Sequence, residues 1–119
     1  MVSDNLANKN KYSFFCPAYY DEKNIATVVE KAVTLFTEIA QDYEIIIIND
    51  GSPDDTGKVC EELSKKYEKV KVIHHKTNLG YGVALKDGFS HANKFEYICF
   101  TDGDNQYDVY DLKKMIPLL

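Results

Sequence analysis

The chain has 119 residues, 45% of them hydrophobic, and its 19 acidic against 14 basic residues give a formal net charge of −5. This length suits one domain rather than two, and the apolar fraction is sufficient for a core. An acidic chain lacks the basic surface that non-specific nucleic-acid binding requires, so nucleic acid is excluded as a partner. No apolar run is long enough to cross a bilayer.

Residues 1–11 are rich in Asn, Lys, Ser and Asp and are predicted to form a disordered arm. A short strand follows over 12–16, and Pro17 is expected to stop it. A helix is predicted over 22–40, where apolar residues recur with i, i+3, i+4 spacing. The next strand, 43–48, contains four consecutive isoleucines, and such a β-branched run predicts a central strand that is covered on both faces.

The second half of the chain continues this alternation. Ser52 is predicted to be the N-cap of a second helix, with Pro53 at its first position and Tyr67 near its end. The remaining elements are a strand, a helix, a strand and a final helix, over 70–74, 82–93, 95–101 and 108–119. Alternating strands and helices predict an α/β fold with a mainly parallel sheet and helices on both faces.

The three cysteines, Cys16, Cys60 and Cys99, are odd in number and fit neither a zinc site nor a disulfide framework. We expect them to be buried free thiols in a reducing compartment. The polar residues 1–11 differ from a signal peptide. The sequence therefore predicts a soluble, cytoplasmic chain.

Ligands of open α/β sheets bind beyond the carboxyl ends of the strands, where the distinctive loops of this chain lie. After the strand 95–101 come Asp102, Asp104 and Gln106 at alternate positions. Charges at the end of a buried strand are costly unless they are paired. Two carboxylates and an amide supply the hard oxygen ligands that Mg²⁺ or Mn²⁺ prefers, and such a metal commonly holds a diphosphate. The alternative is a polar turn, for which Asp, Gly and Asn are typical.

The loops after the first two strands carry further polar candidates. Tyr19 can lie against a nucleobase and Asp21 can orient the base or ribose, although Asp21 could instead be only a helix N-cap. Asp50 can accept a hydrogen bond from a base N–H, and Gly51 permits close backbone approach. Helix capping alone accounts for Ser52 but not for Asp50, which directly follows the isoleucines.

The loop before the third helix contains two glycines of which Gly80 is the first, and glycines at a helix start favour anion approach to free N–H groups. Lys86, one turn into that helix, is placed to reach a phosphate, the alternative being a solvated lysine. We do not expect His74 or His75 to be a ligand or a catalytic acid.

Four motifs occur in order: Pro-Ala-Tyr-x-Asp, Asp-Gly-Ser after the isoleucines, Asn-x-Gly-x-Gly, and Asp-x-Asp-x-Gln after a strand. In this order they resemble the family 2 glycosyltransferases, most of all the branch that transfers sugars to dolichyl and polyprenyl phosphates. The resemblance covers 12–119 and implies the nucleotide-sugar-binding part of a GT-A fold.

The resemblance also implies roles for individual residues. Pro17, Ala18, Tyr19 and Asp21 would line the base and ribose pocket, and Asp50 would hydrogen-bond the base. Asp102, Asp104 and Gln106 would hold the divalent metal and, through it, the donor diphosphate, which makes the two aspartates the predicted catalytic residues.

The implied activity is a metal-dependent, inverting transfer of a sugar from a UDP- or GDP-sugar, with a lipid phosphate or glycan as acceptor. A membrane-associated location of a longer protein would fit a lipid acceptor. Tyr20 stands where the family usually has Asn, Asp21 where it has Glu, and Asn49 where it has Asp, and these departures concern donor-base identity.

A family catalytic domain is roughly twice as long as this chain. We therefore expect the chain to bind a donor but to transfer little sugar, and to form dimers or aggregates through an uncovered last helix. Two other functions remain open at this point: a sugar nucleotidyltransferase, and a non-catalytic response-regulator-like module with Asp50 as phosphoacceptor.

Overall fold

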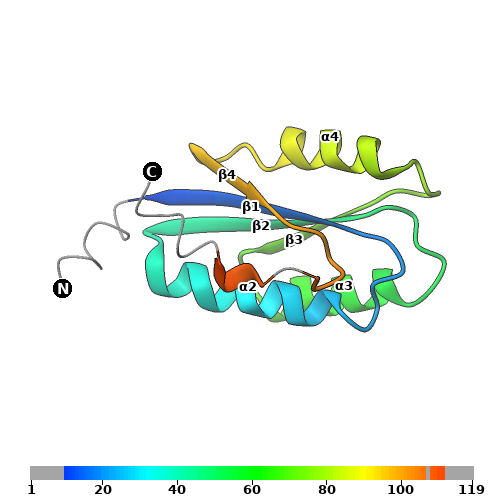
Figure 1. The fold of residues 1–119 in the computed structure, drawn as a ribbon, viewed down its shortest axis with the longest axis horizontal. Coiled ribbons are helices and arrows are strands. Elements are labelled where there is room, and N and C mark those ends of the chain that lie inside the picture. The colour runs from blue at the N-terminus through cyan, green and yellow to red at the C-terminus, as the bar shows by residue number, and fades with distance from the viewer. Residues whose placement is uncertain (1–9, 107, 112–119) are drawn as a thin grey trace.

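A computed structural model describes residues 10–106 and 108–111. In chain order the elements are β1 (Lys11–Ala18), α2 (Ile25–Ile39), β2 (Asp42–Asn49), α3 (Thr56–Lys66), β3 (Val70–His74), α4 (Tyr81–His91), β4 (Tyr97–Phe100) and the 3₁₀ turn η1 (Val109–Asp111). The strands form one sheet in the order β3-β2-β1-β4, and all three pairings are parallel. Figure 1 shows α4 on one face of this sheet and α2 and α3 on the other. The predicted α/β fold is confirmed.

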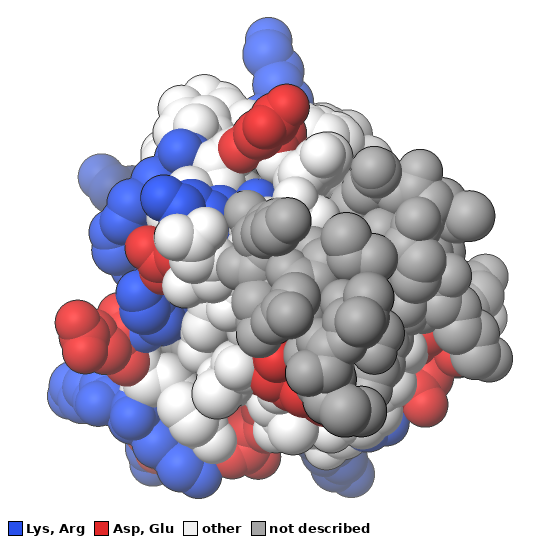
Figure 2. Space-filling view, turned by 90° about the vertical axis from the view of Figure 1, so that its left-hand side faces the viewer, with Lys and Arg blue, Asp and Glu red and all other residues white. Residues whose placement is uncertain are grey.

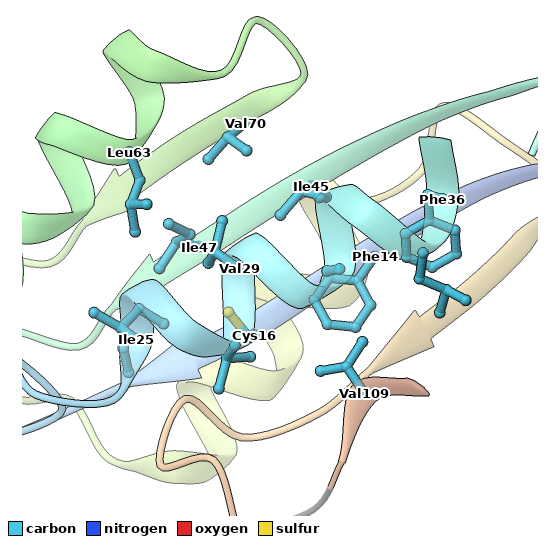
Figure 3. Close-up of a cluster of buried hydrophobic side chains, with 14 of the residues drawn as sticks. Phe14, Cys16, Ile25, Val29, Phe36, Ile45, Ile47, Leu63, Val70 and Val109 are labelled. Carbon is cyan, nitrogen blue, oxygen red and sulfur yellow. The ribbon is translucent and has the colours of Figure 1, made fainter. Parts of the chain in front are cut away.

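The isoleucine strand is central and covered on both faces, as predicted. Ile45 and Ile47 are fully buried in the larger core, beneath α2 and α3. Figure 3 shows both side chains in that core, with Phe14 of β1 and Phe36 of α2 nearby. Ile46 and Ile48 point to the opposite face and join a smaller core with Ala84 of α4. Complete burial of one such side chain is worth about 1.5–3 kcal/mol, so β2 anchors both layers.

Pro17 does not stop the first strand. It pairs with Ile48 inside β1, which continues to Ala18. The carbonyl oxygen of Pro17 accepts a hydrogen bond from the Gly103 N–H at 3.0 Å, so its backbone polar groups face the β4 side. The pairing between β1 and β4 ends at Phe15, before Pro17 is reached. The missing N–H of Pro17 therefore removes no hydrogen bond between these two strands.

The predicted start of the second helix is also wrong. Helix α3 begins at Thr56, and its N-cap is Asp55 rather than Ser52. The carboxylate of Asp54 accepts the Thr56 N–H at 3.0 Å and also the Ser52 hydroxyl, so the predicted first turn is a separate loop closed by side chains. The first helix likewise begins three residues later than predicted, at Ile25.

Three predictions concern residues that lie wholly or partly outside the described ranges. The disordered arm includes residues 1–9, and the last helix includes residues 112–119. The expected self-association depends on apolar side chains of that same helix. Lys11, the last residue of the predicted arm, already belongs to β1. No helix among the described residues is both long and apolar enough to span a membrane.

Figure 2 views the molecule from the side on which the amino ends of the strands lie, opposite their carboxyl ends. On its described part, Lys side chains gather on the left with acidic side chains between them. Charges of both signs are therefore mixed on this face.

A buried polar group joins the two central strands to β4. The Ser13 hydroxyl donates to the Glu44 carboxylate at 2.6 Å and accepts the Phe95 N–H at 3.0 Å. Glu44 also accepts the Lys94 N–H at 2.9 Å. Because Ser13 is fully buried, these bonds set where the chain enters β4 and hence where the loop after β4 lies.

We predict that Ser13→Ala lowers the free energy of unfolding by about 1–3 kcal/mol, because it leaves the part-buried Phe95 N–H without its acceptor and removes one of the donors to the buried Glu44 carboxylate. Urea denaturation measures the change. Ser64→Ala is the matched control, since that hydroxyl bonds a carbonyl of its own helix on the surface. Equal effects of the two substitutions would contradict the assigned role of Ser13.

Candidate functional site

A cleft of about 380 Å³ lies at the carboxyl ends of the strands. It is formed by the end of β1, the loops after β1, β2, β3 and β4, and the start of α4. Its lining comprises Pro17, Ala18, Tyr19, Asp21, Asp50, Asn78, Gly80, Tyr81, Ala84, Asp102 and Asp104. The loops therefore meet where an open α/β sheet is expected to bind its ligand.

The structure brings together most of the predicted site residues. Those that line the cleft are Pro17, Ala18, Tyr19, Asp21, Asp50, Gly80, Asp102 and Asp104. Gly51, Lys86 and Gln106 do not line it. Lys86 and Gln106 are exposed, and the Gln106 N–H donates to the Asp104 carboxylate at 2.9 Å.

Gly51 lies against another loop of the protein. Its φ is +66°, and a Cβ placed there would lie 2.2 Å from the carbonyl carbon of Thr77 and 2.5 Å from the backbone nitrogen of Asn78. The close approach that Gly51 permits is thus made by the loop before α4. This contact joins the second and third loops of the cleft.

Asn78, Tyr81 and Ala84 line the cleft but were not among the predicted site residues. The Tyr81 hydroxyl donates to the Asp102 carboxylate at 2.8 Å, so the start of α4 orients a carboxylate that follows β4. Asn78 and Tyr81 stand within the Asn-x-Gly-x-Gly motif, which was the available signal for both. Ala84 carried no such signal, because a small residue in a helix predicts only packing.

The loop after β1 is held by hydrogen bonds around Asp21. The carboxylate of Asp21 accepts the Tyr19 N–H at 2.9 Å, and the Asp21 N–H donates to the buried Thr56 hydroxyl at 3.0 Å. Burial raises the pKa of Asp21, the Tyr19 N–H opposes that rise, and the carboxylate of Asp104 adds to it. The N-cap of α2 is Asn24, so Asp21 is not the capping residue that the sequence allowed.

Tyr20 occupies the left-handed region with φ of 55°, where Asn is more common than Tyr. Its N–H donates to the Ser52 hydroxyl at 3.0 Å, which links the first two loops. Its side chain is 59% exposed and packs edge-on against Tyr19, which is 42% exposed. Two aromatic rings are therefore available to a ligand at this rim of the cleft.

Asp50 is buried, and its carboxylate is surrounded by donors. One oxygen accepts hydrogen bonds from the Leu79 N–H and from His75 Nδ1, both at 2.9 Å. The other oxygen accepts hydrogen bonds from Asn78 Nδ2 at 3.0 Å and from the Gly80 N–H at 3.2 Å. A carboxylate offers about four acceptor positions, so the protein itself uses all of them. Asp50 thus holds the loop before α4 in place.

In the described part of the chain, three of the four carboxylates that line the cleft have no ion-pair partner, and only Asp50 faces a histidine, His75. None of the described residues that line the cleft is Lys, Arg or His, and the sequence contains no arginine. Within residues 10–106 and 108–111, Asp21, Asp102 and Asp104 form no ion pair. Carboxylate oxygens are ligands that a hard divalent cation prefers, although the described residues bring no three His, Cys, Asp or Glu side chains together as a metal-binding group.

A family model described as Glycosyl transferase family 2 matches residues 13–119. CsbB of Bacillus subtilis (strain 168) is 36% identical to the chain over 104 aligned positions, which cover 87% of this chain and 31% of CsbB. The dolichyl-phosphate beta-glucosyltransferase of Saccharomyces cerevisiae is 30% identical over 132 positions, which cover 99% of this chain and 39% of that enzyme.

A solved structure is also similar to the chain. S. aureus TarS 1-349 in complex with UDP-GlcNAc is 27% identical, with a TM-score of 0.64, over 90% of this chain and 30% of TarS 1-349. The chain spans less than half the length of each of these three proteins.

We predict that Gly51→Ala lowers the free energy of unfolding by about 2 kcal/mol or more, because the new methyl group adds steric overlap to a strained φ. Gly80→Ala is the control, since Gly80 also has a positive φ, of 98°, but has nothing within 4 Å of its would-be Cβ. Thermal and urea denaturation compare the two. If both substitutions cost the same, the contact between the two loops is not what requires Gly51.

Proposed function

This chain belongs to glycosyl transferase family 2, and we propose that its cleft binds the nucleotide diphosphate of a sugar donor through a divalent cation. One observation carries the proposal. The cleft gathers residues from all four sequence motifs, and its described lining contains carboxylates but no cationic side chain. An anionic diphosphate needs a counter-charge there, and a metal ion supplies one.

Two of the similar proteins support the chemical class of donor and acceptor. TarS has been crystallised with UDP-GlcNAc, which supports a nucleotide sugar as donor. The yeast relative is a dolichyl-phosphate glucosyltransferase, which supports a polyprenyl phosphate as acceptor. We therefore propose a UDP- or GDP-sugar as donor and a lipid phosphate as acceptor for the protein of which this chain forms part of the catalytic domain.

Family membership decides between the functions that the sequence left open. The match over residues 13–119 is to glycosyltransferases, not to sugar nucleotidyltransferases or response regulators. Asp50 as a phosphoacceptor is also at odds with the structure, because its carboxylate is buried and accepts hydrogen bonds from four protein groups.

The loop after β1 is suited to the nucleoside. Tyr19 presents an exposed ring that can stack on a base, and stacking tolerates any base. The carboxylate of Asp21 uses one oxygen for the Tyr19 N–H, so its other oxygen can accept a ribose hydroxyl. Base recognition by Asp50 stays a prediction, since a base N–H would have to share or displace a donor that the carboxylate already has.

The start of α4 is suited to the diphosphate. Gly80, its N-cap, lines the cleft, and no side chain caps this helix. Free N–H groups and the positive end of the helix dipole attract phosphate oxygens. Lys86 lies one turn further on, outside the cleft lining, and contributes at most to the surrounding field.

Asp102 and Asp104 would hold Mg²⁺ or Mn²⁺, with Gln106 as a third oxygen ligand. Tyr81 orients the first of these carboxylates and the Gln106 N–H restrains the second. When bound, the cation stabilises the negative charge that develops on the departing diphosphate. The acceptor oxygen bonds to the anomeric carbon as the bond to the diphosphate breaks, and attack from the opposite face inverts that centre.

Nucleotide binding tests the proposed function directly. We expect UDP or GDP to raise the melting temperature in the presence of Mn²⁺, because a ligand that binds only the folded state stabilises it by about 2.7 kcal/mol at 100 times its Kd. CDP and dTDP serve as comparison nucleotides in the same thermal-shift screen. If none of the four nucleotides raises the melting temperature with Mn²⁺, a donor site in this chain is refuted.

The metal ligands are tested by calorimetry with UDP or GDP, with and without Mn²⁺. We predict that Mn²⁺ strengthens binding and that Asp104→Asn removes this strengthening, since two carboxylates and an amide leave few ligands to spare. Asp108→Asn removes a carboxylate from the same segment, where it faces Lys31 at 3.8 Å and does not line the cleft. It should leave the effect of Mn²⁺ intact. Retention of the full effect in Asp104→Asn would show that Asp104 is not a ligand.

A further inference from the structure

His75 lies directly behind the cleft, between the end of β2 and helix α4. Its side chain is only 7% exposed. Nδ1 lies 2.9 Å from a carboxylate oxygen of Asp50, and Nε2 lies 2.6 Å from a carboxylate oxygen of Asp87 on α4. The ring therefore bridges an aspartate that lines the cleft and an aspartate that does not.

Both ring nitrogens of His75 face groups that, when ionised, only accept hydrogen bonds. Each nitrogen must donate for both contacts to be hydrogen bonds, and this requires the imidazolium form. The preceding histidine differs. His74 Nε2 meets the Glu61 carboxylate at 2.6 Å, but its Nδ1 meets the Asn49 amide nitrogen at 2.9 Å, because the amide oxygen of Asn49 is taken by the Ser52 N–H. Only one ring nitrogen of His74 therefore faces a carboxylate, whereas both ring nitrogens of His75 do.

The hydrogen bonds of Asp50 connect His75 to the shape of the cleft. The oxygen that contacts His75 also accepts the Leu79 N–H, and the other oxygen holds Asn78 and the Gly80 N–H. Asn78 and Gly80 line the cleft, and Gly80 is the N-cap of α4. The ring that orients this carboxylate therefore sets where these two residues lie.

We propose that His75 is a positioning residue of the donor site: its imidazolium ties Asp50 to Asp87 and so holds the loop 78–80 in the form that binds the nucleotide diphosphate. His75 itself does not line the cleft and acts through Asp50. The proposal rests on the proposed function for the identity of the ligand, but not for the coupling between the ring and the loop.

The proposal implies a direction of pH dependence. The Asp50 carboxylate raises the pKa of His75, burial opposes this, and Asp87 adds to it; these two are the charged groups that face the ring, one from the end of β2 and one from α4. A raised pKa means that the stabilisation is complete below the unfolded value of about 6.5 and is lost as pH rises through the folded value. A neutral ring would turn a lone pair toward one carboxylate, so the loop should loosen and donor affinity should fall at higher pH.

The experiment follows the whole chain by NMR and calorimetry against pH. We expect the His75 ring signals and the Leu79 and Gly80 amide signals to titrate with one midpoint. UDP or GDP affinity, measured at constant Mn²⁺, should fall on the order of tenfold across that midpoint, the scale of one charged hydrogen bond. Asp87→Asn, at a half-exposed surface position, should move the ring, amide and affinity midpoints together to lower pH.

His91→Gln is the control, because that ring contacts the backbone carbonyl of Asp87 and not its carboxylate, and it should move none of the midpoints. Amide signals that do not follow the ring, or affinity that ignores the His75 midpoint, would overturn the proposal. So would an Asp87→Asn variant whose midpoints stay in place. If the unaltered chain binds neither nucleotide at any pH, the proposed function fails, and the amide titration alone decides whether His75 positions the loop.

Discussion

A buried strand that ends in a buried carboxylate is the constraint on which this molecule depends. The isoleucines of β2 fill the cores on both sides of the sheet, so the strand cannot shift or turn without exposing apolar surface. The chain therefore leaves the sheet at one defined place, and Asp50 follows there. Its carboxylate is costly to bury alone, and the donors that pair with it come from the connection between β3 and α4. One strand end thus places a second loop.

The loops of the cleft also hold one another. Tyr20 reaches Ser52, Asp21 reaches Thr56, Gly51 lies under the backbone of the loop before α4, and Tyr81 reaches Asp102. Each of these contacts joins segments that are distant in sequence. A change at the buried bond between Asp21 and Thr56 is expected to reach both segments, because buried polar groups that lose their partner retain the cost of their desolvation.

The electrostatics of the cleft are unusual for a site proposed to receive an anion. Acidic side chains gather in it, and the burial of Asp21 among them raises its pKa. The positive groups near the cleft are the free N–H groups at the start of α4 and, behind Asp50, the ring of His75. At the proposed donor site, a divalent cation that joins carboxylates to a diphosphate would satisfy both partners.

The sequence by itself determined the alternating elements, the parallel sheet, the two-sided burial of the isoleucines and the place of the loops, since these follow from local periodicity and from the geometry of parallel sheets. It also identified Asp50, Asp102 and Asp104 as acidic residues at strand ends. Only the tertiary structure decided that β1 runs through Pro17, because that depends on which neighbour the proline faces. The same holds for Gly51, which meets the backbone of the loop before α4, and for His75, whose two ring nitrogens meet aspartates at the end of β2 and on α4. Such roles are set by contacts across the fold, and no local pattern encodes which partners will meet.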